Sequence, residues 1–171
     1  MALIVETGAI VANANSYVSL SDCRAYAAAR ALALPVPDAD LEALLIGAMD
    51  YLEGQRARYQ GAKVSPSTQA LQWPRTGVYI DGVAFSETSI PKELKDAQSR
   101  LACEKFAGVD IMPTKIGPFV SEETVGPLTT KYSADQGAGV QPTISAVDAL
   151  LEPLFSQSVA SAGFSLRTVR A

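Results

Sequence analysis

The chain has 171 residues, of which 48% are hydrophobic and 19% are charged, and its formal net charge is −4. This length and this apolar fraction suit one folded domain over 1–171, and they exclude a globally disordered chain. No apolar run approaches the ~20 residues that a membrane-spanning helix needs, and a chain without histidine excludes catalysis or metal binding through imidazole.

The N-terminal part is expected to consist of an extended segment followed by a helix. Residues 1–19 carry few charges and short β-like runs, which indicates an extended segment. Ser19 and Asp22 resemble a variant capping box, so a helix should run over about 20–31. The prolines that begin at Pro35 should end it.

The two cysteines of the chain, Cys23 and Cys103, lie far apart in the sequence, and each lies on an expected helix among alanines. Nothing in the sequence indicates secretion. We therefore expect two buried free thiols, with a disulfide as the minor alternative.

The clearest helix is expected to begin at Asp38, because acidic residues in a first turn interact favourably with the helix dipole. Apolar residues then recur at helical spacing as far as Leu52, and the helix should end near Gly54 or Arg56. This stripe and those of the later helices predict a core of Leu41, Leu44, Leu45, Met49, Leu52, Leu94, Leu101, Leu150 and Leu151.

The segment 57–89 lacks strong periodicity and is expected to be a long extended loop on a helical core that spans 20–115. It carries cations and aromatic residues, with no acid between Gly54 and Ile80. Cations that hold a phosphate backbone and rings that stack on bases are typical of single-strand-binding surfaces. The candidate nucleic-acid patch therefore comprises Arg56, Arg58, Tyr59 and Lys63, interleaved with Trp73, Arg75 and Tyr79.

The alternative for this stretch is a solvated or intersubunit loop. In that case the indole of Trp73 would supply contact area, and the guanidinium of Arg75 would pair with a carboxylate across an interface. The residues themselves leave both alternatives open.

The C-terminal half is expected to hold a third helix over about 90–108, because proline suits a first helical turn and glycine a helix end. A β-hairpin is expected over 116–135 with its turn at Gly126 and Pro127, and a short helix over 143–155. The arm 163–171 contains Arg167 and Arg170 and no acid. It could simply be frayed, but the apolar Phe164, Leu166 and Val169 favour the addition of a strand to another subunit.

Several of these segments together resemble the head–tail adaptor, or connector, family of tailed bacteriophages. The central segments are the run from Trp73 to Val78, the turn at Asp81 and Gly82, and the helix from Ile90–Pro91 to Ala107–Gly108. Residues 1–8, 16–20 and 125–128 and the last three residues of the chain also resemble that family. Members of this group often carry the description putative DnaT-like single-stranded-DNA-binding protein. The resemblance covers nearly the whole chain.

The resemblance implies a mainly α fold: a small helical bundle with a β-hairpin, a long extended loop and extended terminal arms. It implies a structural virion protein without enzymatic activity, cofactor, metal or membrane partner. Such subunits form a ring, usually of twelve copies, in the virion neck after assembly in the host cytoplasm. The expected partners are the portal protein, the next tail or neck connector, and double-stranded DNA that passes through the lumen without specific binding.

The residues assigned to that interface are Trp73, Arg75, Gly126, Pro127, Phe164, Leu166, Arg167 and Arg170. The alternative function is a single-stranded-DNA-binding, DnaT-like replication accessory protein. It ranks second to the adaptor function, because the mean negative charge of the chain opposes phosphate binding.

Overall fold

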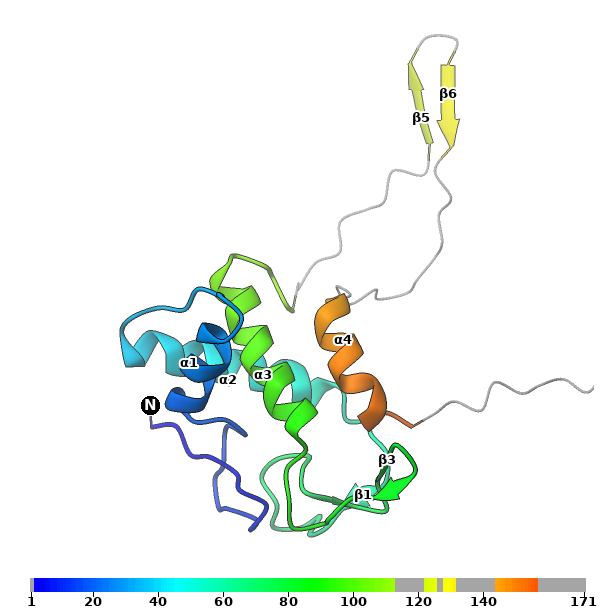
Figure 1. The fold of residues 1–171 in the computed structure, drawn as a ribbon. Helices are drawn as coiled ribbons and strands as arrows, with labels where there is room; N and C mark the ends of the chain where they lie inside the picture. The colour runs from blue at the N-terminus through cyan, green and yellow to red at the C-terminus, as the bar shows by residue number, and fades with distance from the viewer. Residues whose placement is uncertain (1, 113–121, 126–127, 132–143, 157–171) are drawn as a thin grey trace, which may run out of the picture.

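The structure is a computed structural model that describes residues 2–112, 122–125, 128–131 and 144–156 (Figure 1). In these residues, α-helices make up the larger part of the regular structure and short antiparallel hairpins the rest. The predicted mainly α fold with a small β-hairpin is confirmed. The helices are α1 (Leu20–Ala28), α2 (Asp38–Gly54), α3 (Lys92–Phe106) and α4 (Ser145–Leu151), which continues into the 3-10 helix η1 (Glu152–Leu154).

Helix α1 begins where the capping pattern predicted and ends earlier than expected. The hydroxyl of Ser19 accepts the backbone N–H of Asp22 (3.1 Å) and donates to its carboxylate (2.7 Å). The helix ends because Ala31 adopts a left-handed φ of 52°, while the N–H of Leu32 returns to the carbonyl of Ala27 (2.9 Å).

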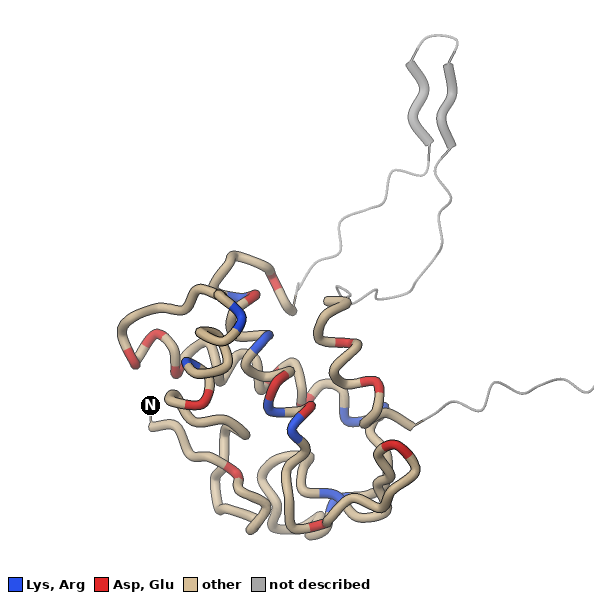
Figure 2. The backbone as a smooth tube through the Cα atoms, in the orientation of Figure 1, with Lys and Arg blue, Asp and Glu red and all other residues tan. Residues whose placement is uncertain are grey.

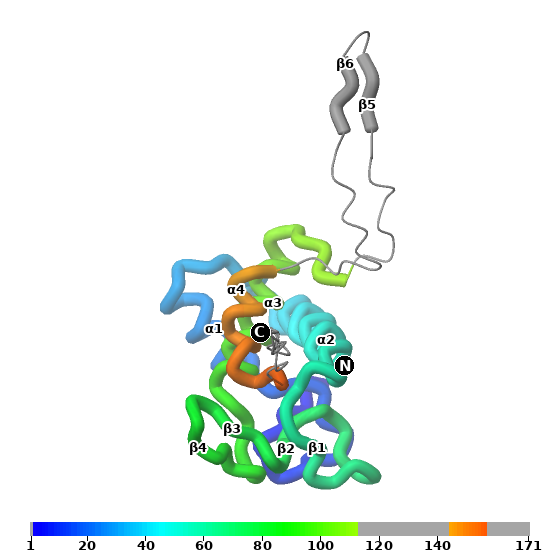
Figure 3. Tube along the Cα trace, turned by 90° about the vertical axis from the view of Figure 1, so that its right-hand side faces the viewer, coloured from blue at the N-terminus to red at the C-terminus, as the bar shows by residue number. Residues whose placement is uncertain are grey.

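Helix α3 lies at the centre of the bundle, and α1, α2 and α4 all pack against it (Figure 3). The predicted core residues are buried between these helices, except Leu44 and Leu150, which are half-buried at the edge of the core. Inside the core, the Gln98 side chain donates to the Leu45 carbonyl (3.1 Å) and accepts the N–H of Tyr17 (2.9 Å). This amide therefore ties the N-terminal segment to two helices.

The N-terminal segment folds onto the core and does not extend away from it as an arm. The buried carboxylate of Glu6 accepts backbone N–H groups of Gly8 (2.8 Å), Ile10 (3.1 Å) and Val11 (2.8 Å). The N–H of Glu6 donates to the carbonyl of Ser16 (2.8 Å). A carboxylate that satisfies three amides holds this loop in place, because buried backbone donors need acceptors.

The segment 57–89 is not the long extended loop that the sequence predicted. It folds into two short hairpins, which lie at one end of the molecule in both views (Figures 1 and 3). This segment has no helical periodicity, and strands of two residues are too short to show a period-2 pattern. The hairpins are β1 (Ala62–Lys63) with β2 (Arg75–Thr76), and β3 (Tyr79–Ile80) with β4 (Val83–Ala84).

The hairpin expected over 116–135 is present as β5 (Glu122–Val125) paired antiparallel with β6 (Leu128–Lys131). The expected turn residues Gly126 and Pro127 lie outside the described residues, as does the arm 163–171.

Cys23 and Cys103 are free and buried, which confirms that prediction. Burial raises the pKa of the Cys23 thiol to about 11, so it stays protonated at neutral pH. Across the part of the chain that the structure describes, no helix is long and apolar enough to cross a membrane.

Candidate nucleic-acid interface

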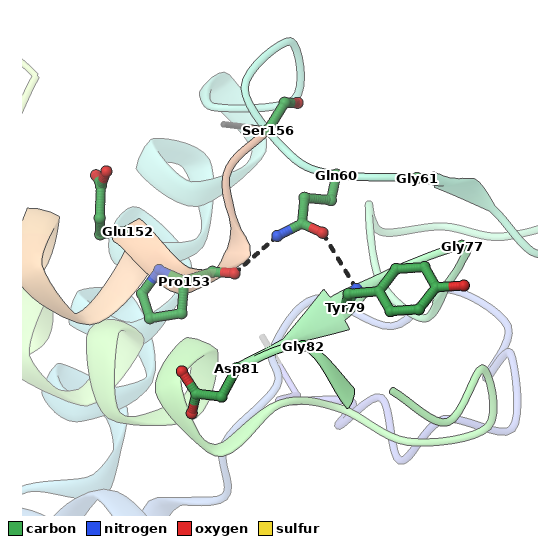
Figure 4. A pocket seen from close by; sticks show the side chains of 9 residues that line it. All are labelled: Gln60, Gly61, Gly77, Tyr79, Asp81, Gly82, Glu152, Pro153 and Ser156. Carbon is green, nitrogen blue, oxygen red and sulfur yellow. Dashed lines mark hydrogen bonds between the residues drawn. The ribbon is translucent and has the colours of Figure 1, made fainter. Parts of the chain in front are cut away.

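A groove of about 670 Å³ lies between the β-hairpins and the end of η1 (Figure 4). The hairpin β3–β4 contributes Tyr79, Asp81 and Gly82 to its lining. The segments beside β1 and β2 contribute Gln60, Gly61 and Gly77, and the C-terminal side contributes Glu152, Pro153 and Ser156. The groove therefore joins residues that are more than ninety positions apart in the sequence.

The Gln60 side chain connects the two sides of this groove, as the dashed lines in Figure 4 show. Its amide nitrogen donates to the carbonyl of Pro153 (2.8 Å), and its amide oxygen accepts the N–H of Tyr79 (3.1 Å). The backbone of Gln60 adds a bond from its N–H to the carbonyl of Leu154 (3.0 Å). These hydrogen bonds fix the position of β3 relative to η1.

The turn between β3 and β4 places an aromatic ring at the edge of the groove. Asp81 and Gly82 have φ values of 51° and 79°, as a two-residue type I′ turn requires. In this hairpin Tyr79 is 58% exposed, and its ring extends along the groove edge away from Asp81 (Figure 4). An exposed ring on a strand of a hairpin is suited to stacking on a planar ligand.

Trp73, the aromatic residue favoured from the sequence, is fully buried. Its ring packs edge-on against Tyr59 at a centroid distance of 5.8 Å and against Phe85 at 6.4 Å. Its backbone N–H donates to the hydroxyl of Tyr17 (3.0 Å). Trp73 thus has no free ring face to offer a base or a partner subunit, and it anchors the hairpins on the core.

Arg75 is also buried, at 7% exposure, and its guanidinium binds backbone groups of its own chain. The guanidinium donates to the carbonyls of Gln60 (2.6 Å) and Gly61 (2.7 Å) and to the Gln72 side chain (3.3 Å). Burial lowers the pKa of this group. The rigid fork of an arginine suits this role as a clamp across the β1–β2 hairpin.

The four residues of the predicted nucleic-acid patch have different environments. Tyr59 is buried and donates to the carbonyl of Leu52 (3.0 Å), whereas Arg56 is exposed. The guanidinium of Arg58 lies over the Phe155 ring, 3.9 Å from its centroid, and Lys63 is half-buried. The structure therefore leaves Arg56 and Arg58 as the accessible cations of this patch.

The backbone of Arg58 lies beside the groove. Its carbonyl accepts the backbone N–H of Ser156 (2.7 Å) and the Ser156 hydroxyl (3.0 Å), and Ser156 lines the groove. Elsewhere on the described trace, segments of both charge signs are present, and the charged residues of α2 are all acidic (Figure 2).

The sequence analysis missed Gln60, Glu152 and Ser156 as groove residues. The turn signal of Asp81 and Gly82 was visible, but no local pattern linked it to a segment near residue 152. The remaining interface candidates, Gly126, Pro127, Phe164, Leu166, Arg167 and Arg170, lie outside the described residues. Within the described ranges, no group of three or more Cys, Asp or Glu could hold a metal ion.

A family model described as "Putative DnaT-like ssDNA binding protein" matches residues 1–171. No curated protein and no solved structure matches the chain.

The family match overturns the adaptor interpretation and supports the alternative function. The expected virion role is wrong, and with it the expected partners: a twelve-copy ring, the portal protein, the next connector, and double-stranded DNA in the lumen. The mean negative charge of the chain does not exclude DNA binding, because a local surface can differ from the mean field. The absence of enzymatic activity stays a prediction.

Proposed function

Because this chain belongs to the family of putative DnaT-like ssDNA binding proteins, we propose that it binds single-stranded DNA. The observation that carries the proposal is the match of the family model over residues 1–171. The geometry supports it with a groove that carries the exposed ring of Tyr79 and with the exposed Arg58, whose carbonyl bonds to the groove residue Ser156.

We assign the phosphate contacts to Arg56 and Arg58. Both are exposed on the loop that follows α2, and the Arg58 backbone bonds to Ser156 at the groove edge. Packing on the Phe155 ring limits the motion of the Arg58 side chain, and its Nη1 donates to the Gln55 side chain (3.1 Å). A cation that is held in place loses less entropy when it binds a phosphate.

We assign base stacking to Tyr79 in place of the buried Trp73 and Tyr59. Stacking on an aromatic ring contributes about 1–3 kcal/mol per base and tolerates any sequence, because every base has a π-face. Among the aromatic residues of the described chain, Tyr79 combines high exposure with a position on a groove.

The acidity of the chain should weaken its affinity for single-stranded DNA. With a net charge of −4, the mean field repels DNA, so the affinity should depend on a few local contacts. Two phosphate contacts to a single strand predict a slope of about −1.4 for log K against log salt concentration.

The first prediction tests the cations through fluorescence anisotropy of a labelled twelve-nucleotide deoxycytidine strand. Arg56→Ala with Arg58→Ala should weaken binding roughly tenfold and flatten the salt slope by about 1.4, because two phosphate contacts are lost.

Arg30→Ala is the control, because Arg30, like Arg58, lies over an aromatic ring (Tyr26, 3.7 Å to the centroid) but follows α1 and is not on the loop after α2. This variant should bind like the unaltered protein. If the unaltered protein fails to bind any single strand at low salt, the proposed function is wrong.

A further inference from the structure

The hairpin β3–β4 carries the Tyr79 ring but makes few contacts with the rest of the chain. Of residues 79–84, Ile80 packs against the core, and the others are exposed. These residues form a single hydrogen bond with a described residue outside the hairpin, from the N–H of Tyr79 to the Gln60 side chain (3.1 Å). Since a two-stranded hairpin is marginally stable by itself in water, its order depends on such a tether.

The other end of this tether is the segment 58–60, which η1 and the residues after it hold in place. The N–H of Ser156 donates to the Arg58 carbonyl (2.7 Å). The N–H of Gln60 donates to the Leu154 carbonyl (3.0 Å), so the two segments pair antiparallel. The Gln60 side chain therefore connects a fixed segment that carries a cation to a hairpin that carries an aromatic ring.

We propose that Gln60 is a positioning residue of the single-stranded-DNA site. Its side chain holds the Tyr79 ring at a fixed place relative to Arg58, so that one strand contacts both. This inference rests on the proposed function and deepens it. Gln60 acts through Tyr79 and needs no contact of its own with the strand.

The Gln60 side chain suits this role because its amide is both a donor and an acceptor. The amide oxygen accepts the N–H of Tyr79, and the amide nitrogen donates to the Pro153 carbonyl (2.8 Å), as Figure 4 shows. Methionine has a similar length and no charge, but its thioether donates no hydrogen bond and accepts only weakly. Gln60→Met therefore releases the tether without a change of charge near the DNA.

The competing explanation is that Gln60 contributes only to the stability of the fold. Salt dependence separates the two roles. The slope of log K against log salt concentration reports the phosphate contacts, whereas the affinity extrapolated to about 1 M salt reports the non-electrostatic contacts such as stacking. If Gln60 acts through the Tyr79 ring, its loss should lower the extrapolated affinity and leave the slope unchanged.

The second prediction is that Gln60→Met weakens the extrapolated affinity for the labelled deoxycytidine strand roughly fivefold, the factor that one typical hydrogen bond contributes. The slope should stay at about −1.4, because Arg56 and Arg58 are unchanged. In a Tyr79→Ala protein, whose backbone N–H still reaches Gln60, the same substitution should cause no further loss. A residue that acts through the ring has no effect once the ring is absent, and a double-mutant cycle measures this coupling.

Asn15→Leu is the matched control. The half-buried Asn15 amide also accepts a backbone N–H (Ile4, 2.8 Å) and donates to a backbone carbonyl (Ala2, 3.2 Å), but it lies in the N-terminal segment and does not line the groove. This variant should bind the strand like the unaltered protein, with circular dichroism confirming that it is folded. Equal losses in Asn15→Leu and Gln60→Met, or an undiminished effect of Gln60→Met in the Tyr79→Ala protein, would refute the positioning role.

Hydrogen exchange in the unaltered protein keeps the inference testable if Gln60→Met does not fold. The N–H of Tyr79 should exchange more slowly, as followed by NMR, when the deoxycytidine strand is bound, because binding requires the tethered hairpin. The N–H of Ile4, which bonds to Asn15, should exchange at the same rate in both states. An unchanged rate at Tyr79 in the bound protein would overturn the inference.

Failure of this inference differs from failure of the proposed function. If the unaltered protein binds the strand and Gln60→Met binds it equally well, the positioning role is wrong and the proposed function stands. If the unaltered protein binds no single strand at low salt, both are wrong.

Discussion

At the level of single residues, the two side chains with the strongest sequence signal have roles inside the fold. Trp73 is fully buried and Arg75 is a clamp for backbone carbonyls, whereas the less conspicuous Tyr79 is exposed on a groove. Residue type therefore indicated that aromatic and cationic side chains are present in 57–89, but it could not indicate which of these side chains face solvent. That depends on how the hairpins pack on the helices.

Glu53, near the end of α2, supplies a prediction about pH. Its carboxylate accepts the N–H of Gln72 (2.9 Å) and the hydroxyl of Tyr17 (3.2 Å). Burial raises the pKa of Glu53 above its ordinary value of 4.5, although these hydrogen bonds offset part of the effect. The folded state thus binds the proton more tightly than the unfolded state, so stability should fall as the pH rises from about 4.5 through the raised pKa.

The third prediction is that Glu53→Gln raises the melting temperature at pH 8 relative to the unaltered protein. The amide keeps an acceptor for Gln72 and Tyr17 but carries no charge to bury. At pH 4 the two proteins should melt at nearly the same temperature, because Glu53 is then mostly protonated. Circular dichroism melts between pH 4 and pH 8 measure this difference; an equal loss of stability at both ends of the range would contradict the assignment.

At the level of elements, the two short hairpins depend on glycines and turn residues more than on strand propensity. Gly61 has a φ of +63°, and a Cβ there would lie 2.0 Å from the carbonyl oxygen of Thr76. Gly82 has a φ of +79°, but a Cβ there would meet nothing within 4 Å. At both positions a side chain would be strained by the positive φ, but only at Gly61 would it also meet a nearby backbone atom.

The fourth prediction uses this difference. Gly82→Ala should cost about 1 kcal/mol in the free energy of unfolding, because alanine is strained at positive φ. Gly61→Ala should cost more, because the Thr76 carbonyl has to move and Thr76 pairs with Ala62 in β1–β2. Urea unfolding of both variants checks the order, and equal costs would show that the contact at Gly61 relaxes freely.

At the level of the whole molecule, the hairpins, the N-terminal segment and the helices share one core. The Trp73 N–H bonds to Tyr17, its ring contacts Tyr59, and Tyr59 contacts Phe155 after η1 (5.6 Å between centroids). Leu151 of α4 is fully buried in the same core. These contacts favour a single cooperative unit over separate helical and hairpin parts.

The fifth prediction is that Trp73 fluorescence and far-ultraviolet circular dichroism report one coincident unfolding transition. Trp73 is the single tryptophan of the chain and senses the hairpin side, whereas circular dichroism senses the helices. Leu151→Ala should shift both transitions equally, by about 2–5 kcal/mol, because it leaves a cavity in a shared core. Two separated transitions would show independent parts.

The amino-acid order alone was enough to locate the helices and most of the core. The capping pair Ser19 and Asp22, the acidic start of α2 at Asp38 and the apolar stripe through Leu45 are local signals, because helix formation depends on neighbours within a few residues. The folding of 57–89 into hairpins, the burial of Trp73 and the groove itself could not be found in this way. They arise from contacts between segments such as Gln60 and Pro153, and burial depends on those distant contacts, which no local pattern encodes.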